Sequence, residues 1–398
     1  MLLLTSPGAG AEDAPGNALV SAIQEGSAQL DLRYRYETVD SDSFDKRARA
    51  SLLRSRLTLT TGAVGGVTAL FEVDNVAGIG VDDFNSTDNG KSEFPTIADP
   101  EGTEFNQAWV ALSNGGFNAT LGRQRVLLGE MRFIGSKPWR NNEQTYDGLR
   151  LRWQAGSALS IDASYVNQIN RIFGPEDGTN PADWHGDNLF LNAEYRPTPN
   201  HTITAFAYLL DVEAQRTFTA AQTVNNSSSS YGIEYQGALS AVELRAAVAT
   251  QVDAGASELN YRAPYYLVEL GAPWAGFGFR AAYEVLGTDN GVGLATPLAN
   301  GHRYQGWADQ FLATPQDGLE DAWISVDRTL GPVAITARYH SFRAESSSTV
   351  FGSEVDLQAL WTVNERLTAT LKAGLFNAEA ADRFTDTTKA WLVLQYRI

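Results

Sequence analysis

The sequence of 398 residues contains no cysteine and only four histidines. Without cysteine the chain can form no disulfide framework, thiol nucleophile, zinc ribbon or iron–sulfur site. Its formal net charge of −17 disfavours nucleic acid as a partner, because phosphate binding requires a basic surface. No apolar run approaches the ~18 residues that a membrane-spanning helix needs. A helical membrane protein is therefore excluded, whereas a transmembrane β-barrel, which is apolar only at alternate positions, is not.

Catalytic and metal-binding patterns are also absent from the sequence. The histidines are His185, His201, His302 and His340, and no two of them have a metal-type spacing. Adjacent residues of a strand point to opposite faces, so His340 and Ser341 cannot pair as base and nucleophile. The acidic run 82–88 lacks the glycine and the terminal glutamate of a calcium loop. We expect no enzymatic activity, no cofactor and no dedicated metal site, with only loose calcium binding open to the acidic loops.

The N-terminal residues differ in pattern from the rest of the chain. Residues 1–11 read MLLLTSPGAGA and resemble the remnant of a signal peptide, in which an apolar stretch precedes small residues. The alternative is an unstructured N-terminus. Residues 12–28 are predicted to form a periplasmic segment with one short helix, because Leu19, Ala22 and Ile23 share one face at helical spacing.

From residue 29 the hydrophobic pattern changes to a period of two. Leu30, Leu32 and Tyr34 alternate with polar residues, and the same alternation recurs to the end of the chain. This pattern predicts eighteen β-strands. We expect them at residues 29–38, 49–60, 66–75, 104–112, 117–124, 145–153, 158–168, 187–196, 201–211, 228–237, 240–251, 259–270, 276–286, 319–328, 332–343, 352–361, 366–377 and 388–398.

The connections between these strands alternate between short and long. Short ones such as 61–65 and 113–116 are rich in turn-forming residues, and long polar ones such as 76–103 and 169–186 lie between them. Outer-membrane barrels have this layout, with short periplasmic turns and long extracellular loops. A sandwich leaves the asymmetry unexplained, and a β-helix or propeller requires a fixed repeat that the sequence lacks. The predicted fold is all-β: one transmembrane antiparallel β-barrel over residues 29–398, in the outer membrane of a Gram-negative bacterium.

The last strand also fits a barrel. Ala390, Leu392, Leu394, Tyr396 and Ile398 form one apolar face of a segment that closes the chain. A closing strand with an apolar last residue resembles the signal read by the barrel assembly machinery, which is therefore an expected partner. Lipid and lipopolysaccharide of the outer membrane are expected around the barrel.

Four segments resemble the alginate export family of outer-membrane porins. They are residues 18–37, residues 105–112 together with 121–124, residues 139–151 (WRNNEQTYDGLRL) and residues 301–321 (GHRYQGWADQFLATPQDGLED). The resemblance implies an 18-stranded barrel that acts as a diffusion channel, with an anionic polysaccharide as the family's name-giving cargo. It also implies a monomer.

The polar face of the strands is assigned to the lumen, because a charge facing lipid at the membrane midplane costs about 2–4 kcal/mol. The predicted pore-lining residues are Arg33, Arg35, Arg54, Arg56, Glu72, Arg150, Arg152, Arg280, Arg338, Glu354, Asp356 and Lys372. Arginine dominates the cations, and its planar fork grips carboxylates through two bonds. Two interpretations stay open: the arginines pass an anionic solute along the lumen, or they pair with lumen acids and stiffen the wall.

Two long segments stand out as candidates to enter or cover the pore. Segment 125–144 combines apolar and basic residues and is predicted to fold into the lumen, although packing on a neighbouring loop is the alternative. The constriction candidates are Arg123, Arg125, Arg132, Lys137 and Arg140. Segment 287–318 contains Tyr304, Trp307 and Phe311, is too long to be structureless, and is predicted to cap the mouth.

These observations predict a porin that lets small polar or anionic solutes diffuse through a lumen lined by arginines and acids. Uronate-type saccharides such as alginate are candidate solutes. The alternative function is a non-conducting structural or adhesion barrel that works through its acidic surface loops. The charge content of the inward face favours a water-filled lumen and hence the porin.

Overall fold

The computed structural model describes residues 15–213, 215–216, 223–224 and 227–398. One helix, α1 (Pro15–Gln24), precedes the strands. Eighteen strands form one antiparallel sheet that closes on itself. These strands are β1 (Ser27–Ser41), β2 (Ala48–Thr60), β3 (Val67–Asp83), β4 (Gly102–Asn114), β5 (Phe117–Gln124), β6 (Thr145–Ala155), β7 (Leu159–Asn170), β8 (Asp183–Thr198), β9 (His201–Leu210), β12 (Ser228–Leu239), β13 (Val242–Asp253), β14 (Arg262–Trp274), β15 (Phe277–Leu286), β18 (Leu319–Leu330), β19 (Val333–Arg343), β20 (Val350–Thr362), β21 (Leu367–Ala378) and β22 (Thr387–Arg397).

The barrel predicted from the alternating pattern is confirmed. Each strand pairs with its neighbours in chain order, and the ring closes where β1 pairs with β22. All eighteen expected strands are present, with differences mainly at their ends: β3 continues to Asp83, eight residues beyond the expected end. None of the helices in the described part of the chain is long and apolar enough to cross a membrane.

The burial of side chains is the reverse of that in a water-soluble protein. Leu121 and Ile324 point outward and are 64% and 61% exposed, whereas Arg35 and Glu354 point inward and are 1% and 0% exposed. Alternation along a strand places the two sets on opposite faces of the wall. The apolar face is the one that lipid covers, and the polar face encloses the lumen.

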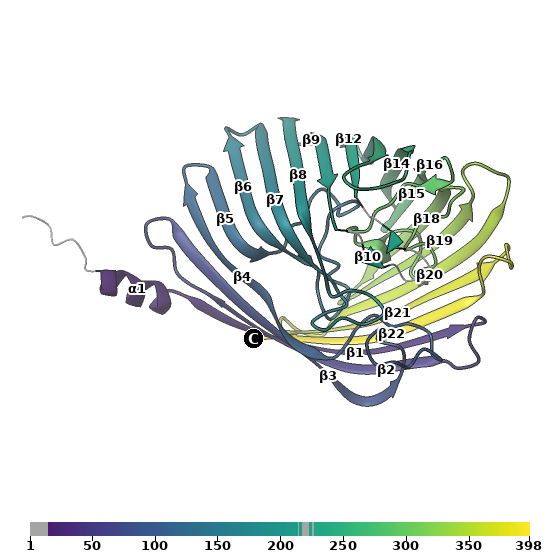
Figure 1. The fold of residues 1–398 in the computed structure, drawn as a ribbon, viewed down its shortest axis with the longest axis horizontal. Helices are drawn as coiled ribbons and strands as arrows, with labels where there is room; N and C mark the ends of the chain where they lie inside the picture. Colours follow the sequence, from purple (N-terminus) through teal and green to yellow (C-terminus); the bar gives the residue numbers. More distant parts are fainter. Residues whose placement is uncertain (1–14, 214, 217–222, 225–226) are drawn as a thin grey trace, which may run out of the picture.

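The two ends of the barrel differ as predicted. At one end the strands are joined by short turns: Gly115 and Gly116, for example, join β4 to β5, and both have a positive φ that glycine adopts without strain. Helix α1 projects from this end (Figure 1), and its Ala22 carbonyl accepts a hydrogen bond from the Gly62 N–H of the β2–β3 turn at 2.8 Å. In outer-membrane barrels the short turns face the periplasm. Residues 1–11, predicted to be a signal-peptide remnant, lie outside the described residues.

The longer connections meet at the other end, and two of them fold back into the barrel. One is the 125–144 loop, between β5 and β6. The other is the 287–318 loop, between β15 and β18, which contains the small strands β16 (Thr288–Asp289) and β17 (Val292–Gly293) and the 3-10 helix η1 (Gly301–Arg303). A further hairpin, β10 (Gln215–Arg216) with β11 (Thr223–Val224), lies in the connection between β9 and β12.

Candidate functional site

The 125–144 loop crosses the lumen. At one side, Arg33 of β1 donates a hydrogen bond to the Pro138 carbonyl at 3.0 Å. At the other side, the Phe133 ring lies 5.3 Å from the ring of Phe206 on β9 and 5.3 Å from that of Tyr265 on β14. In the ring of eighteen strands β1 and β9 stand almost opposite each other. The loop therefore lies inside the barrel between these strands, and its role as the constriction stays a prediction.

Buried charges fasten this loop to β1, β2 and β3. Glu143 is the centre: it accepts a hydrogen bond from Arg56 at 2.7 Å, forms a shorter contact with Arg125, and lies 4.0 Å from Arg54. Arg125 also reaches Glu72 of β3 at 2.6 Å. A buried pair that loses one partner leaves an uncompensated charge, so this network holds the loop firmly.

The arginines predicted to line the pore on β1 and β2 lie beneath the loop. Arg33, Arg35, Arg54 and Arg56 point inward and are all buried. Arg33 binds the loop through Asn141 and backbone carbonyls, and Arg35 binds Glu37 at 2.7 Å and stacks over Trp139 at 4.5 Å. On this wall the interpretation that arginines pair with lumen acids describes the geometry. Their role for a solute stays a prediction.

The 287–318 loop enters the lumen instead of capping the mouth. Its backbone docks on β20, where the Ala308 N–H binds Glu354 at 2.7 Å and the Trp307 N–H binds Asp356 at 3.3 Å. The Lys372 ammonium of β21 lies 3.7 Å from the centre of the Trp307 ring. The expected cap was wrong in position, because carboxylates deep in the wall offer acceptors to the backbone of the loop.

The two loops bind each other and form one body inside the barrel. The Gly135 N–H binds the Leu298 carbonyl at 3.0 Å, and the Asn300 N–H binds the Met131 carbonyl at 3.0 Å. Nearer the short-turn end, the Arg303 guanidinium pairs with Glu130 at 2.5 Å. The body meets both walls, so any solute must pass between it and the remaining lumen surface.

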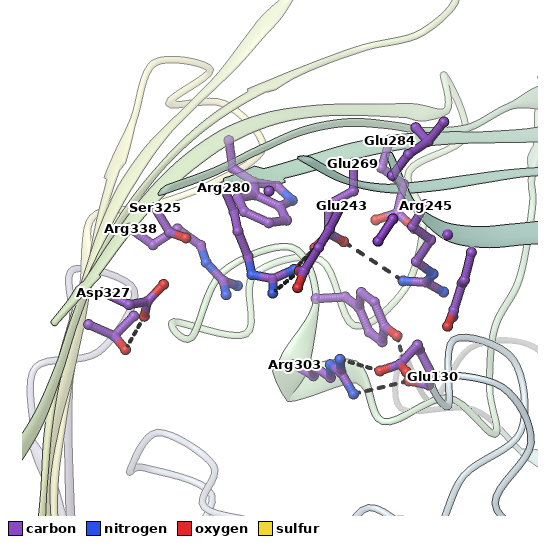
Figure 2. Close-up of a pocket in the computed structure, with 18 of the residues that line it drawn as sticks. Glu130, Glu243, Arg245, Glu269, Arg280, Glu284, Arg303, Ser325, Asp327 and Arg338 are labelled. Atoms are coloured by element: carbon purple, nitrogen blue, oxygen red, sulfur yellow. Dashed lines mark hydrogen bonds and ion pairs between the residues drawn. The ribbon is translucent and has the colours of Figure 1, made fainter. Parts of the chain in front are cut away.

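A cavity of about 680 Å³ lies between this body and the wall formed by β12 to β20. We call it the vestibule. It opens toward the short-turn end, where Asn200 of the β8–β9 turn and Gly237 line it, and it ends against Glu130 and residues 303–305 at the tips of the loops. Figure 2 shows Arg303 and Glu130 facing the wall residues across the cavity. A cavity of this volume is in the range of small-molecule sites.

Charged side chains of both signs line the vestibule (Figure 2). Arg280 of β15 pairs with Glu243 at 2.6 Å and with Glu269 at 3.1 Å. Arg245 of β13 pairs with Glu234 at 2.8 Å. Uncharged polar side chains and two indole rings also line it, among them Thr202, Gln236, Ser325, Thr336, Gln358, Trp307 and Trp323. The surface suits a hydrated solute that carries hydrogen-bonding groups.

The other predicted site residues are spread over the wall and the loops. Arg150 pairs with Asp162 at 2.5 Å, and Arg152 binds the Asn118 amide oxygen at 2.9 Å. Arg132 pairs with Glu284 at 2.5 Å, and Arg140 with Glu37 at 3.4 Å. Arg123 belongs to β5 and not to the loop, and its guanidinium pairs with Asp147 of β6 at 2.8 Å.

Sequence reasoning missed the contribution of the 287–318 loop to the vestibule. Arg303, Tyr304 and Gln305 line the cavity together with Glu130. The signal was available: Tyr304, Trp307 and Phe311, together with Arg303, give this loop the same mixture of apolar and basic residues that predicted an inward position for the 125–144 loop.

Burial in the loops alters two basic groups. The pKa of Lys137 falls to about 7, because the ammonium is buried and Arg171 is nearby. Its partners are neutral: Gln144 Oε1 at 2.6 Å and the Pro297 carbonyl at 2.8 Å. Burial also lowers the pKa of His302 to about 3, an effect that Lys372 reinforces and Asp309 opposes. Both groups are therefore less easily protonated than in water.

The histidines contact charged and polar side chains: His302 lies 2.8 Å from Asp309 and 2.7 Å from the Lys372 ammonium, and His201 lies 2.7 Å from the Tyr235 hydroxyl. His340, the most buried of them, has its Nδ1 2.9 Å from Asp321 and its Nε2 3.6 Å from Asp356. Among the residues that the structure describes, no group of three or more histidine or acidic side chains could hold a metal ion.

Comparison with known proteins places the chain among barrels of this kind. A family model described as alginate export matches residues 25–281. The structure of OpdO (OccK3) from Pseudomonas aeruginosa superposes with a TM-score of 0.71 at 13% identity, covering 97% of this chain and 99% of that one. OccK9 (OpdG) from the same organism gives 0.70 at 17% identity, covering 95% and 99%. At these identities the likeness shows the fold. No functionally curated protein matches the sequence.

Proposed function

The chain belongs to the alginate export family of outer-membrane porins, and from this premise we propose that it lets small polar or anionic solutes diffuse through its lumen by way of the vestibule. The barrel lies in the outer membrane of a Gram-negative bacterium, with lipid around its apolar face. The family and the barrel support a role as a transporter. Passage is passive, because a barrel of this kind offers a path and no source of energy.

The vestibule is the observation that carries the proposal. A barrel that served only as a support would need few charges inside, since each unpaired buried charge is costly. Here the cavity is open at the short-turn end and is lined by exposed ion pairs such as Arg280 with Glu243, whose side chains are 44% and 61% exposed. Exposed pairs on an inner surface indicate water, and water in the lumen is what a diffusing polar solute requires.

The 125–144 and 287–318 loops set the constriction in this proposal. Their tips meet at the Arg303–Glu130 pair, where the vestibule ends. A solute that leaves the vestibule passes these tips, so the side chains there select by size and charge. Uronate-type saccharides stay candidate solutes, supported by the family and by the arginines of the lumen.

Conductance in planar bilayers tests the proposal. We expect discrete single-channel steps from the folded protein, and a reversal potential in a salt gradient that reports the sign of the preferred ion. Oligoalginate is then added. Block of the current supports uronates as solutes, whereas an unchanged current contradicts uronates as solutes but leaves the porin function supported. Absence of conductance from correctly folded barrels would overturn the proposal in favour of a structural or adhesion barrel with acidic surface loops.

Assembly and oligomeric state are part of the same proposal. The C-terminal strand β22 ends in an apolar face that includes Leu392 and Leu394, which supports recognition by the barrel assembly machinery. We expect a monomer surrounded by lipid and lipopolysaccharide. Deleting Ile398 should slow assembly in cells without changing the conductance of the barrels that do form, and light scattering in detergent should give the mass of one chain.

A further inference from the structure

The arginines of the vestibule are not equivalent. Four of them line the cavity, and three have a carboxylate partner: Arg245 with Glu234 at 2.8 Å, Arg280 with Glu243 at 2.6 Å, and Arg303 with Glu130 at 2.5 Å. Each of these three guanidinium groups already has the charge-assisted bonds that an incoming carboxylate would offer. An anionic solute would have to displace a neighbouring glutamate to bind them.

Arg338 of β19 is the exception. Within the described residues it forms no hydrogen bond and no ion pair, and its Nε is buried without a partner. Its guanidinium carbon lies 4.5 Å from the centre of the Trp323 ring, so one face of the group is covered by an indole. A guanidinium stacked in this way keeps its N–H groups free at the edge.

The acid opposite Arg338 makes its one hydrogen bond among the described residues to the 287–318 loop. In the register of β19 and β20 Arg338 faces Asp356. Asp356 accepts the Trp307 N–H at 3.3 Å and lies 3.6 Å from His340, and it makes no ion pair with Arg338. The loop therefore binds one oxygen of this carboxylate, while the other, Oδ2, has no hydrogen-bond partner among the described residues. In Figure 2 Arg338 lies near Arg280 at the vestibule wall.

The total charge of the lining limits what can bind there. Against the four arginines stand five carboxylates: Glu130, Glu243, Glu269, Glu284 and Asp327. A polyanion would bring several negative charges into a cavity that is on balance acidic, whereas a solute with one carboxylate meets one free guanidinium. Because Coulomb repulsion grows with each added charge, the difference increases with the length of the anion.

We propose that the vestibule is a binding site for small monocarboxylates, whose carboxylate is held by Arg338 and whose hydroxyl groups meet the uncharged polar lining at Ser325, Thr336 and Gln358. This rests on the proposed porin function and narrows its solute class. It implies that a uronate enters as a monomer and not as a chain, and that neutral sugars bind more weakly than their acids.

Binding can be measured separately from transport. Isothermal titration of the full-length protein in detergent uses three probes: mannuronate, mannose and hexamannuronate. We expect mannuronate to bind and Arg338→Gln to weaken that binding about tenfold or more, as loss of a charge-assisted hydrogen bond implies. Hexamannuronate, at equal concentration of molecules, should bind no more tightly than the monomer. Arg338→Lys should restore part of the affinity.

Arg328→Gln is the matched control. Arg328 lies on the neighbouring strand β18, stacks over Phe277 at 4.4 Å, and does not line the vestibule. Its substitution should leave mannuronate affinity unchanged. Single-channel conductance of every variant confirms that the barrels are folded and open.

Each outcome decides a different claim. Mannuronate affinity that is equal in the wild type and Arg338→Gln overturns the assignment of Arg338. Hexamannuronate that binds more than tenfold tighter than the monomer overturns the restriction to single charges. Specific binding without conductance would support the binding site and contradict the porin function. Conductance without binding of any probe would contradict the binding site and support the porin function.

Discussion

Two walls of the same lumen use arginine in opposite ways. On β1 and β2 the guanidinium groups are buried beneath the 125–144 loop, and Arg54 and Arg56 share Glu143 with it. On β15 and β19 they face the vestibule, where Arg280 is 44% exposed and Arg338 has no partner among the described residues. The inward-facing pattern on the strands is the same. The two walls differ in whether a loop covers them. An arginine beneath a loop binds that loop and stabilises the structure, whereas an arginine on an uncovered wall faces the solute.

The largest effect on the free energy of unfolding is expected at Glu143. This residue is the centre of the covered wall, the part of β1–β3 that lies beneath the 125–144 loop. Glu143→Gln removes the charge that Arg56 and Arg125 share while keeping the size of the side chain. Breaking a buried ion pair costs about 3–5 kcal/mol, so the free energy of unfolding should fall by that order. The loop should also detach from β1–β3 and raise the single-channel conductance.

Glu93→Gln is the control for this experiment, since Glu93 forms an exposed pair with Lys46 at 3.4 Å. Exposed pairs contribute about 0–1 kcal/mol, so stability and conductance should hardly change. Equal effects of the two substitutions would contradict the division of the lumen into a covered and an open wall.

The second effect concerns the aromatic anchor of the 287–318 loop. Phe311 is buried, with its ring centre 4.5 Å from that of Phe342 on β19 and 5.8 Å from that of Phe376 on β21. Phe311→Ala should destabilise the protein by about 3–5 kcal/mol, the usual cost of removing a buried phenylalanine. Noise in the open-channel current should increase as the loop loosens. A quiet current at full stability would show that the loop is held by its backbone bonds alone.

The third effect is a dependence on pH. The pKa of Lys137 is lowered to about 7, against an ordinary value of 10.5. Between these two values the unfolded chain carries a proton that the folded chain has released, so the free energy of unfolding should rise with pH across that window. Lys137→Met should flatten the rise, measured by urea unfolding at about pH 7 and about pH 10. Lys46→Met, at an exposed position, should leave the rise intact.

The smallest effect on stability is expected at the tips of the loops. Arg303 and Glu130 form an exposed pair at 2.5 Å, with side chains 45% and 36% exposed. Arg303→Gln should change the free energy of unfolding by less than about 1 kcal/mol. It should nevertheless shift the reversal potential toward cations, because Glu130 then stands alone at the end of the vestibule. An unchanged reversal potential would place the ion path away from this pair.

The barrel could be predicted from the sequence because its signal is local. Each strand shows which face meets lipid through its own alternating residues, and the connection lengths add the orientation. The inward position of the 125–144 loop was predictable for the same reason: Leu128, Phe133 and Ile134 would be out of place in an exposed extracellular loop.

The pairing of charges could not be predicted, because it depends on contacts between distant segments. Arg280 and Arg338 occupy equivalent inward positions, yet among the described residues Arg280 forms ion pairs with two glutamates and Arg338 forms no ion pair. Asp356, opposite Arg338 on β20, accepts its hydrogen bond from the Trp307 backbone N–H and forms no ion pair with Arg338. No pattern in the sequence around Arg338 predicts that contact.

The central claim is that solutes cross the barrel through the vestibule, and chemical modification tests it most directly. The chain has no cysteine, so Gln358→Cys places one reactive thiol in the vestibule lining. A bulky charged methanethiosulfonate added from the short-turn side should lower the single-channel current in one step, whereas Ser347→Cys, in the exposed β19–β20 loop, should react without changing it. A current that stays constant although mass spectrometry shows complete modification at residue 358 would contradict the claim.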